Sequence, residues 1–471
     1  MPKDLRTFIR NISIIMPDQI QMITEKVDPR FGVTAIAGRL AKEGKFPALF
    51  FTNLQGSSLP LVINLTATYE RLALALDTSV AQMTKAYGER ELNPIPSQVV
   101  SDGPVKEIIL KGEKASLSVL PIPTHNELDS GPYITGGVLI CKDPDTGRHN
   151  AGIYRHEVQA NDQLGVYFQG AHHAGYIHQR YSEMNTPTEV AIAIGHYPAF
   201  MLGAVSRVAG VGGEFEEAGA LLGEPLELVK AETVDLLVPA RAEIVIEGII
   251  PPHETHFEGP FGEWPGYYVA EGEKPFIKVK AITMRKDAIY YDVFAANQEH
   301  LVLGSLPRMG NIYRRVKETV PGLVNVNVPA HARTHCYISI NKSADAEVKK
   351  AAFAALTTEA ENLRFIVVVD DDIDVFNEHE VMWAIGTRCR PEKDLLVIPD
   401  WAGPGGLNPV GWEYHRDEAR TPVMTSVLVM DATEPAAPRR YPPRVKVPEK
   451  TMAGLRLDAL LRPFDPKVVK S

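Results

Sequence analysis

The chain of 471 residues is poor in cysteine and in basic residues, and each shortage excludes a class of protein. Its cysteines, Cys141, Cys336 and Cys389, are widely separated and form no CxxC pair. A disulfide framework and a zinc ribbon are therefore excluded, and a cytoplasmic location is expected. With 49 Lys and Arg against 59 Asp and Glu, the formal net charge is −10. A nucleic acid partner is not expected, because binding phosphates requires an excess of basic residues.

Long hydrophobic runs are also missing. The most apolar stretch, residues 190–205, is interrupted by Gly195, Pro198 and Gly203. It is unsuited to crossing a membrane, and it predicts a buried strand, a turn and a second strand. The first residues lack a basic segment followed by an apolar core, so a signal peptide is not expected. A composition of 45% hydrophobic and 23% charged residues is typical of a globular protein with two or three domains.

The hydrophobic pattern predicts a multidomain α/β (α+β) fold. Over residues 1–115, apolar runs at 48–51 and 61–65 predict strands, and residues 69–76 and 79–87 have helical spacing. This first region is expected to be a small N-terminal α/β region. Short β-rich runs separated by Gly and Pro predict a barrel or a strongly twisted sheet from residue 116 to 315.

The last part of the chain, residues 316–471, returns to an α/β pattern. A strand at 335–340, a helix at 345–361 and an apolar strand at 365–369 predict a crossover unit. A proline-rich stretch then precedes a short amphipathic segment at 452–461. That segment fits an arm that packs on a neighbouring subunit and equally fits a helix that caps its own domain.

Two glutamates stand five residues apart in the segment Glu258-Gly-Pro-Phe-Gly-Glu263. Glycine and proline exclude a helix or a central strand, so the segment is expected to be a shaped loop that holds both acids in a fixed geometry. Two acids in unlike surroundings can differ in proton affinity, so that one donates a proton while the other stays ionised. Aromatic residues around the acids favour the binding of a flat ligand; they are Phe261, Trp264, Tyr267 and Tyr268.

Three further segments carry polar side chains with the chemistry of metal ligands. They are Asn150-Ala-Gly-Ile-Tyr-Arg155, the pair His172-His173, and the acidic segment from Gly213 to Gly223. Amide and carboxylate oxygens with imidazole nitrogen suit Mn²⁺ or Mg²⁺ better than a soft metal. Such a site is naturally completed by the phosphate oxygens of a cofactor.

The order and spacing of these segments resemble the UbiD family of decarboxylases, from about residue 10 to residue 430. The resemblance implies prenylated flavin mononucleotide (FMN) as cofactor, bound in a central split β-barrel domain, and a C-terminal oligomerisation domain with an arm. It implies a cofactor-binding set of Asn150, Ile153, Tyr154, Arg155, His172, His173 and Glu214.

Within that set, the resemblance assigns Mn²⁺ or Mg²⁺ to Asn150, His173 and Glu214. The local alignment leaves Glu216 or Glu217 as alternatives to Glu214, and the roles of His172 and His173 can be exchanged. A neighbouring K⁺ is expected near Ala151, Ala204, Ser206 and Arg388.

Arg155, Glu258 and Glu263 match the catalytic trio of the family. The charge of Arg155 is expected to keep Glu258 ionised, and Glu263 is the expected proton donor, with a pKa raised by burial against Phe261 and Trp264. We expect Trp264 to form a wall of the substrate pocket and His300 to contact a ring hydroxyl or a ring nitrogen of the substrate.

The predicted function is the reversible, non-oxidative decarboxylation of an aromatic, heteroaromatic or α,β-unsaturated carboxylic acid through a covalent adduct with prenylated FMN. The enzyme is expected to be a homodimer or homohexamer that receives its cofactor from a flavin prenyltransferase. A metal-dependent hydrolase that uses the same acids and a non-catalytic assembly subunit are the alternatives. The run Asp370-Asp-Asp372 is expected to be a solvated strand end.

Overall fold

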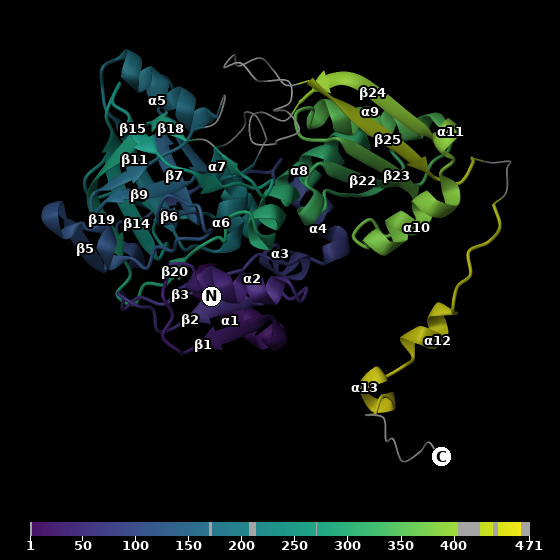
Figure 1. Cartoon of the computed structure of the whole chain (residues 1–471), viewed down its shortest axis with the longest axis horizontal. Coiled ribbons are helices and arrows are strands. Elements are labelled where there is room, and N and C mark those ends of the chain that lie inside the picture. The colour runs from purple at the N-terminus through teal and green to yellow at the C-terminus, as the bar shows by residue number, and fades with distance from the viewer. Residues whose placement is uncertain are drawn as a thin grey trace.

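The computed structural model describes residues 2–168, 172–206, 213–269, 271–403, 424–436 and 441–462. Figure 1 shows an N-terminal part at the bottom of the molecule, a large central sheet at the upper left and a C-terminal sheet at the upper right. The helix α8 (Gln298–Thr319) lies between the two upper parts, and the end of the chain extends away from all three. This arrangement confirms the predicted mixed α/β multidomain fold.

The N-terminal part is a small sheet covered by helices. In the described chain the strand order is β1-β2-β3-β20, with β1 parallel to β2 and β3 antiparallel to β2. Its elements are α1 (Leu5–Ile15), β1 (Ile20–Ile23), α2 (Gly32–Ala41), β2 (Ala48–Phe51), β3 (Leu61–Ile63), α3 (Tyr69–Ala75) and α4 (Val80–Arg90), with β20 (Tyr290–Tyr291) from far along the sequence. The strands and helices predicted here are therefore present.

The central part is a curled antiparallel sheet. Within the described residues its order is β6-β9-β10-β19-β14-β11-β7-β8, and β5 pairs with β19. The strands are β5 (Ile108–Lys111), β6 (Tyr133–Ile134), β7 (Gly137–Lys142), β8 (His149–Ile153), β9 (His156–Ala160), β10 (Gln163–Gly165), β11 (Thr188–Ile194), β14 (Ile244–Ile250) and β19 (Phe276–Met284). The central β-rich region predicted from the sequence is thus a curled half-barrel.

The stretch at 190–205 differs from its prediction. Residues up to Ile194 form β11, but the second half is the buried helix α6 (Pro198–Gly203) and not a strand. Gly195 has a φ of +76°, which lets the chain turn, and Pro198 begins the helix, where its missing N–H is not needed. Apolar content alone does not separate a short buried helix from a buried strand.

Two short ribbons and one small sheet lie beside the central sheet. The loop that carries Glu258 and Glu263, called the acidic loop, begins at the end of β15 (His256–Glu258), which pairs with β18 (Gly272–Lys274). It contains β16 (Phe261–Gly262), which pairs with β17 (Tyr268–Val269). The small sheet has the order β13-β12-β4 among the described strands. Its members are β4 (Gln98–Val99), β12 (Glu227–Lys230) and β13 (Leu237–Pro239).

The C-terminal part is a mixed sheet with the order β21-β22-β23-β25-β24 in the described residues. The predicted crossover is present, because β22, α9 and β23 follow one another and the two strands are parallel. The elements are β21 (Leu323–Asn327), β22 (His335–Ile340), α9 (Ala346–Thr358), β23 (Phe365–Asp370), α10 (Glu378–Arg388), α11 (Pro391–Asp394), β24 (Leu395–Ala402) and β25 (Met424–Ala432).

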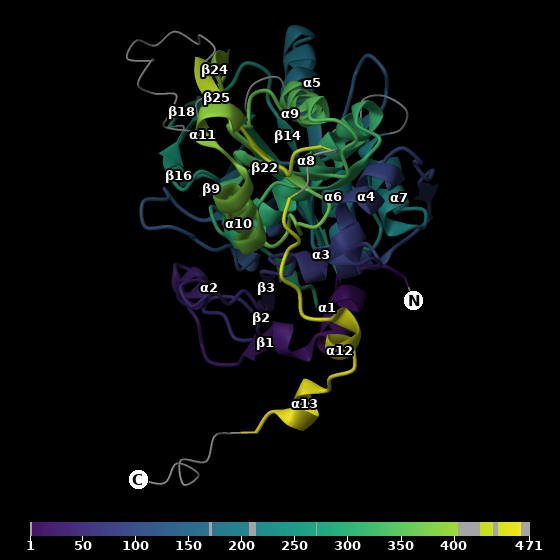
Figure 2. The same ribbon diagram turned by 90° about the vertical axis from the view of Figure 1, so that its right-hand side faces the viewer.

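The tail forms two short helices, α12 (Glu449–Ala453) and α13 (Leu457–Leu460), where the sequence pattern predicts one amphipathic segment. In Figures 1 and 2 it runs away from the C-terminal sheet, so the described tail does not cap its own domain. Residues 437–440, within the proline-rich stretch, lie outside the described residues. None of the helices described here is long and apolar enough to cross a membrane.

The parts exchange strands along the chain. Strand β5 belongs to the central sheet although it precedes residue 115, and β20 joins the N-terminal sheet although it follows the central strands. The domain boundaries at residues 115 and 315 stay a prediction. As a consequence, the chain leaves the central sheet after β19, joins the N-terminal sheet as β20 and then enters α8.

The first turn of α8 is fixed by the buried carboxylate of Glu299. It accepts hydrogen bonds from the N–H groups of Asn64 and Thr66, at 2.6 and 2.8 Å, and from the hydroxyl of Tyr291 at 2.9 Å. The donors come from the N-terminal part and from β20, so one side chain joins three segments. A satisfied buried carboxylate of this kind holds the start of the helix in one position.

Helix α6 packs closely on α7 (Glu214–Leu222) through a glycine. A Cβ added at Gly203 would lie 2.6 Å from the Cα of Ala218, so the two backbones leave no room for a side chain. By contrast, a Cβ at Gly38 in α2 would meet no atom within 4 Å. The same substitution should therefore have opposite effects at these two positions.

We expect Gly203→Ala to lower the free energy of unfolding by about 1–3 kcal/mol, because α6 and α7 must separate. Gly38→Ala should raise it by about 0.5–1 kcal/mol, because alanine is the better helix former. Equilibrium denaturation of both variants measures the two changes. Equal effects at the two positions would contradict the close packing of α6 on α7.

Candidate active site

Arg155 lies in the short connection between β8 and β9 and binds both glutamates of the acidic loop. Its Nε and one Nη donate to the two oxygens of Glu258, each at 3.0 Å, and the other Nη donates to Glu263 at 2.9 Å. The guanidinium also lies 4.5 Å from the ring centroid of Tyr167 and 5.0 Å from that of Phe261. The predicted catalytic trio is therefore one contiguous cluster.

The loop that carries the glutamates is held by its own turn and by a neighbouring segment. Glu263 donates its N–H to the carbonyl of Tyr267 and accepts at its own carbonyl from Gly266, whose φ is +84°. The N–H of Gly262 donates to Asp129 at 2.9 Å. The sequence prediction of a shaped loop with fixed acids agrees with this geometry.

The two glutamates differ in their surroundings. Glu258 is fully buried behind Arg155, and burial raises its pKa while the bonds to Arg155 oppose that rise. Burial, the largest single effect, would lower the pKa of Arg155, but the bonds to Glu258 together with the charges of Glu258 and Glu263 outweigh burial and raise that pKa, so the guanidinium stays charged. Glu263 keeps 12% of its side chain exposed and makes only one bond to Arg155. Glu263 is thus the less restrained of the two acids.

A second polar cluster brings together Asn150, His173 and Glu214. The amide of Asn150 donates to Glu214 at 2.7 Å, and Nδ1 of His173 lies 3.8 Å from the same carboxylate oxygen. The bond to Glu214 raises the pKa of His173, against the opposing effect of burial. The three residues come from β8 and from the first turns of α5 (His173–Glu183) and α7. Two helix N-termini at one place favour an anion such as phosphate.

The sequence left Glu216, Glu217 and His172 as alternative ligands at this cluster, and each has different contacts in the structure. Glu216 accepts the N–H of Gly213 at 2.9 Å and the hydroxyl of Ser97 at 3.0 Å, so it caps α7. Glu217 lines the same cavity as Glu214, and burial raises its pKa to about 7. His172 also lines the cavity, but its neighbour His173 is the one that reaches Glu214.

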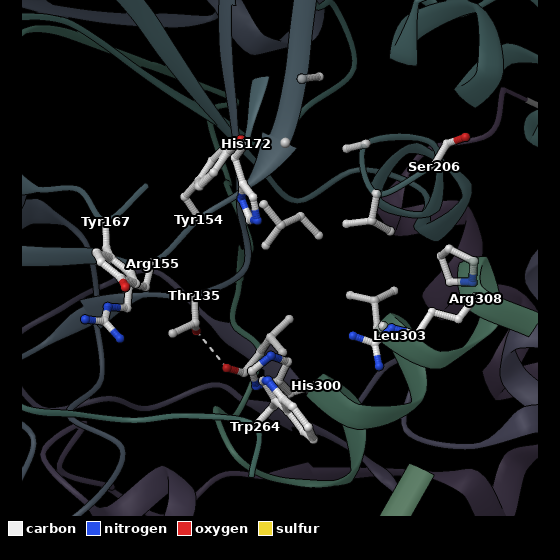
Figure 3. Close-up of a pocket in the computed structure, with 18 of the residues that line it drawn as sticks. Thr135, Tyr154, Arg155, Tyr167, His172, Ser206, Trp264, His300, Leu303 and Arg308 are labelled. Atoms are coloured by element: carbon white, nitrogen blue, oxygen red, sulfur yellow. Dashed lines mark hydrogen bonds between the residues drawn. The ribbon is translucent and has the colours of Figure 1, made fainter. Parts of the chain in front are cut away.

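One cavity of about 820 Å³ joins the two clusters. Figure 3 shows Arg155 and Tyr167 at one side, Tyr154 and His172 at the top, and His300 and Trp264 at the bottom. Its walls include almost all the predicted cofactor, metal and substrate residues, among them Asn150, Ala151, Ile153, Tyr154, Arg155, His172, His173, Ala204, Ser206, Glu214, Glu263, Trp264 and His300. Its volume suits a ligand of cofactor size.

Arg388, expected beside the K⁺ site, is placed elsewhere by the structure. It ends α10 and binds Asp370 at 3.0 Å and Asp372 at 2.8 Å, with Glu434 also at 3.0 Å. It does not line the cavity, because these three carboxylates hold it in the C-terminal part. The prediction that Asp370 and Asp372 form a solvated strand end is therefore wrong, because both carboxylates bind the buried Arg388.

Two arginines of the cavity wall, Arg308 and Arg333, are not among the residues predicted from the sequence. Arg308 follows His300 by eight residues on α8, with Gly304 between them, so all three lie on one face of the helix. That spacing was a usable signal. Arg333 follows a separate short helical turn, and nothing in its local sequence relates it to the site.

Comparison with known proteins agrees with this geometry. Family models for the N-terminal, Rift-related and C-terminal domains of 3-octaprenyl-4-hydroxybenzoate carboxy-lyase (UbiD) match residues 17–91, 98–298 and 301–405. The anhydromevalonate phosphate decarboxylase of Methanothermobacter thermautotrophicus is 34% identical over 434 residues, which cover 91% of this chain and 97% of that protein.

Solved structures give the same result. The UbiD-class enzyme HmfF of Pelotomaculum thermopropionicum, in complex with FMN, is 36% identical with a TM-score of 0.88, over 97% of this chain and 100% of that one. An evolved dimeric form of HmfF is in complex with prenylated FMN. The 3,4-dihydroxybenzoic acid decarboxylase of Klebsiella pneumoniae is 26% identical with a TM-score of 0.86, over 96% and 99% of the two chains.

The half-barrel, the cavity and these matches define a carboxy-lyase of the class that uses a modified flavin. The chain belongs to the UbiD family.

Proposed function

We propose that this enzyme decarboxylates an aromatic, heteroaromatic or α,β-unsaturated carboxylic acid in the cavity between Arg155 and Asn150, with prenylated FMN as its cofactor. The observation that carries the proposal is that one cavity joins an acid–base cluster to a cluster suited to a metal and a phosphate. The relatives named above, which are decarboxylases or bind FMN, support the proposal.

The donor set on the phosphate side fits a divalent metal ion. The amide oxygen of Asn150, a ring nitrogen of His173 and the carboxylate of Glu214 are ligands that Mn²⁺ or Mg²⁺ accepts, and cofactor phosphate would supply the remaining oxygens. Ala151, Ala204 and Ser206 lie on the same wall, where their backbone carbonyls would serve K⁺. When bound, prenylated FMN supplies an electrophilic group that takes up electrons as CO₂ leaves.

The chain's own residues supply orientation and a proton. Arg155 stays fixed because Glu258 holds it through two bonds, while Glu263 is held through one. Glu263 can therefore turn toward the substrate without releasing Arg155. In its protonated form it donates a proton to the carbon that has lost CO₂, so that a C–H bond replaces the C–C bond. The same steps in reverse would carboxylate the product.

The C-terminal arm favours a homo-oligomer, a homodimer or a homohexamer. Val445, Met452, Leu455 and Leu460 are all exposed on the arm, and a segment with this much exposed apolar surface gains by packing on a second chain. One similar structure is an evolved dimeric form. We also propose that a flavin prenyltransferase supplies the cofactor and that the enzyme is cytoplasmic.

Replacing Glu263 with Gln should leave the cofactor bound and lower CO₂ release at least about 100-fold, because the amide of glutamine is far too weak an acid to protonate carbon. The measurement is CO₂ release from accepted acids, together with the flavin absorbance of the purified protein. Glu273→Gln, an exposed residue near the same loop, is the control and should be unaffected. Full activity of the Glu263 variant would remove this residue from the proposed role.

Replacing Glu214 with Gln should lose metal and cofactor together, because glutamine lacks the negative charge that Glu214 contributes to a ligand set whose other members, Asn150 and His173, are neutral when they bind a metal. Glu216→Gln is the matched control two residues away, and it should keep both, since glutamine also caps a helix. Elemental analysis and flavin absorbance of the purified variants measure the outcome. Loss of metal from the Glu216 variant alone would reverse the assignment.

A further inference from the structure

One end of the cavity is formed by His300, Arg308 and Arg333 around the ring of Trp264, and these three residues are called the donor end below. The guanidinium carbon of Arg333 lies 5.0 Å from the ring centroid, and that of Arg308 lies 6.0 Å from it. Arg308 is 5% exposed and Arg333 is 8% exposed. In Figure 3 Arg308 lies on the opposite side of the cavity from Arg155.

His300 presents a proton donor to the cavity. Its Nδ1 accepts the backbone N–H of Ala296 at 3.2 Å. Burial lowers its pKa to about 3, with a further contribution from the charges of Arg333 and Arg308, so the ring is neutral at neutral pH. A neutral imidazole that accepts at Nδ1 carries its hydrogen on Nε2. The remaining ring nitrogen is therefore a donor.

The two arginines are held in place by the protein. Arg308 donates to the side-chain oxygen of Asn362 at 3.1 Å and lies 3.7 Å from the buried carboxylate of Glu359, while Arg333 donates to the carbonyl of Gly304 at 3.5 Å. Glu361 also lines the cavity, but it is exposed, so solvent screens its charge. The guanidinium groups are shielded from water and keep a strong local field.

The chemistry of the donor end selects its ligand. Arginine has N–H donors and no acceptor, and the free nitrogen of His300 is also a donor. A hydroxyl or an amine can accept one of these hydrogen bonds, but its own hydrogen would find no acceptor among these side chains, and it carries no negative charge to match the two arginines. A carboxylate or a phosphate offers acceptors only, carries the complementary charge and matches the planar fork of arginine.

The reacting carboxylate has a different place in the cavity. The proton from Glu263 must reach the carbon that loses CO₂, so that carbon lies near Glu263 and Arg155. In Figure 3 Arg308 lies across the cavity from Arg155 and His300 lies at its bottom, and Trp264 packs against Arg308 and Arg333. The donor end therefore offers charge and N–H donors away from the place of the reacting carboxylate.

We propose that His300, Arg308 and Arg333 bind a second anionic group of the substrate, so that the substrate is an unsaturated acid with a further carboxylate or phosphate remote from the reacting carbon. This inference rests on the proposed decarboxylase function and specifies its substrate class. Carboxylate and phosphate share the chemistry that the donor end recognises, and the experiment below separates them.

The test compares three acids on one ring: 4-methylbenzoate, benzene-1,4-dicarboxylate and 4-phosphonooxybenzoate. Calorimetry measures their binding to protein purified from cells that also make a flavin prenyltransferase. We expect at least one of the two acids with a second anionic group to bind at least about 10-fold more tightly than 4-methylbenzoate. The tighter of the two identifies carboxylate or phosphate as the preferred group.

Arg333→Gln should weaken that tighter binding about 10- to 100-fold and change the binding of 4-methylbenzoate less than about 2-fold. Arg308→Gln should act in the same direction. Arg315→Gln is the control, because Arg315 is on the same helix but exposed and paired with Glu318. Equal binding of all three acids, or an equal loss for all three in the Arg333 variant, would overturn the proposal.

CO₂ release from the same acids separates this inference from the proposed function. Selective, Arg333-dependent binding with no CO₂ released from any acid would contradict the proposed decarboxylase function and still support the anion site. Release of CO₂ from 4-methylbenzoate as readily as from the other two acids, unchanged in Arg333→Gln, would remove the anion site and leave the decarboxylase.

Discussion

The bonds from Arg155 to Glu258 and Glu263 are the constraint on which the site depends. Three ionisable side chains lie together in a mostly dry place, where none of them could be buried in charged form alone. The unequal division of these hydrogen bonds between the two glutamates also matters. Glu258 takes two and fixes the arginine, which leaves Glu263 with one bond and the freedom to serve the substrate.

The curled sheet sets the distance between this cluster and the phosphate side. Asn150 lies on β8, and Arg155 follows two residues after the strand ends. Five residues span at most about 16 Å when extended, so Asn150 and Arg155 line different parts of the same cavity. The helices α5 and α7 then bring His173 and Glu214 to Asn150 by their first turns. Strand β8 and the two residues after it thus position both Asn150 on the phosphate side and Arg155 in the catalytic cluster.

Much of this site could be predicted from the sequence, because its motifs are local. The acids at Glu258 and Glu263 stand in a loop that glycine and proline define, and Asn150 and Arg155 stand in one short segment. What the sequence did not reveal depends on tertiary contacts. Arg333 reaches the cavity from a distant turn, Arg388 is held away from it by three carboxylates, and residues 198–203 form a helix where apolar content suggested a strand.

The central claim is that both clusters act on one flavin. A crystal structure of the protein loaded with prenylated FMN tests it most directly. The account predicts the cofactor phosphate beside Asn150, His173 and Glu214, and the ring system beside Arg155 and Glu263 in the same cavity. A flavin bound elsewhere, or one whose ring points away from Arg155 while its phosphate occupies the other cluster, would contradict it.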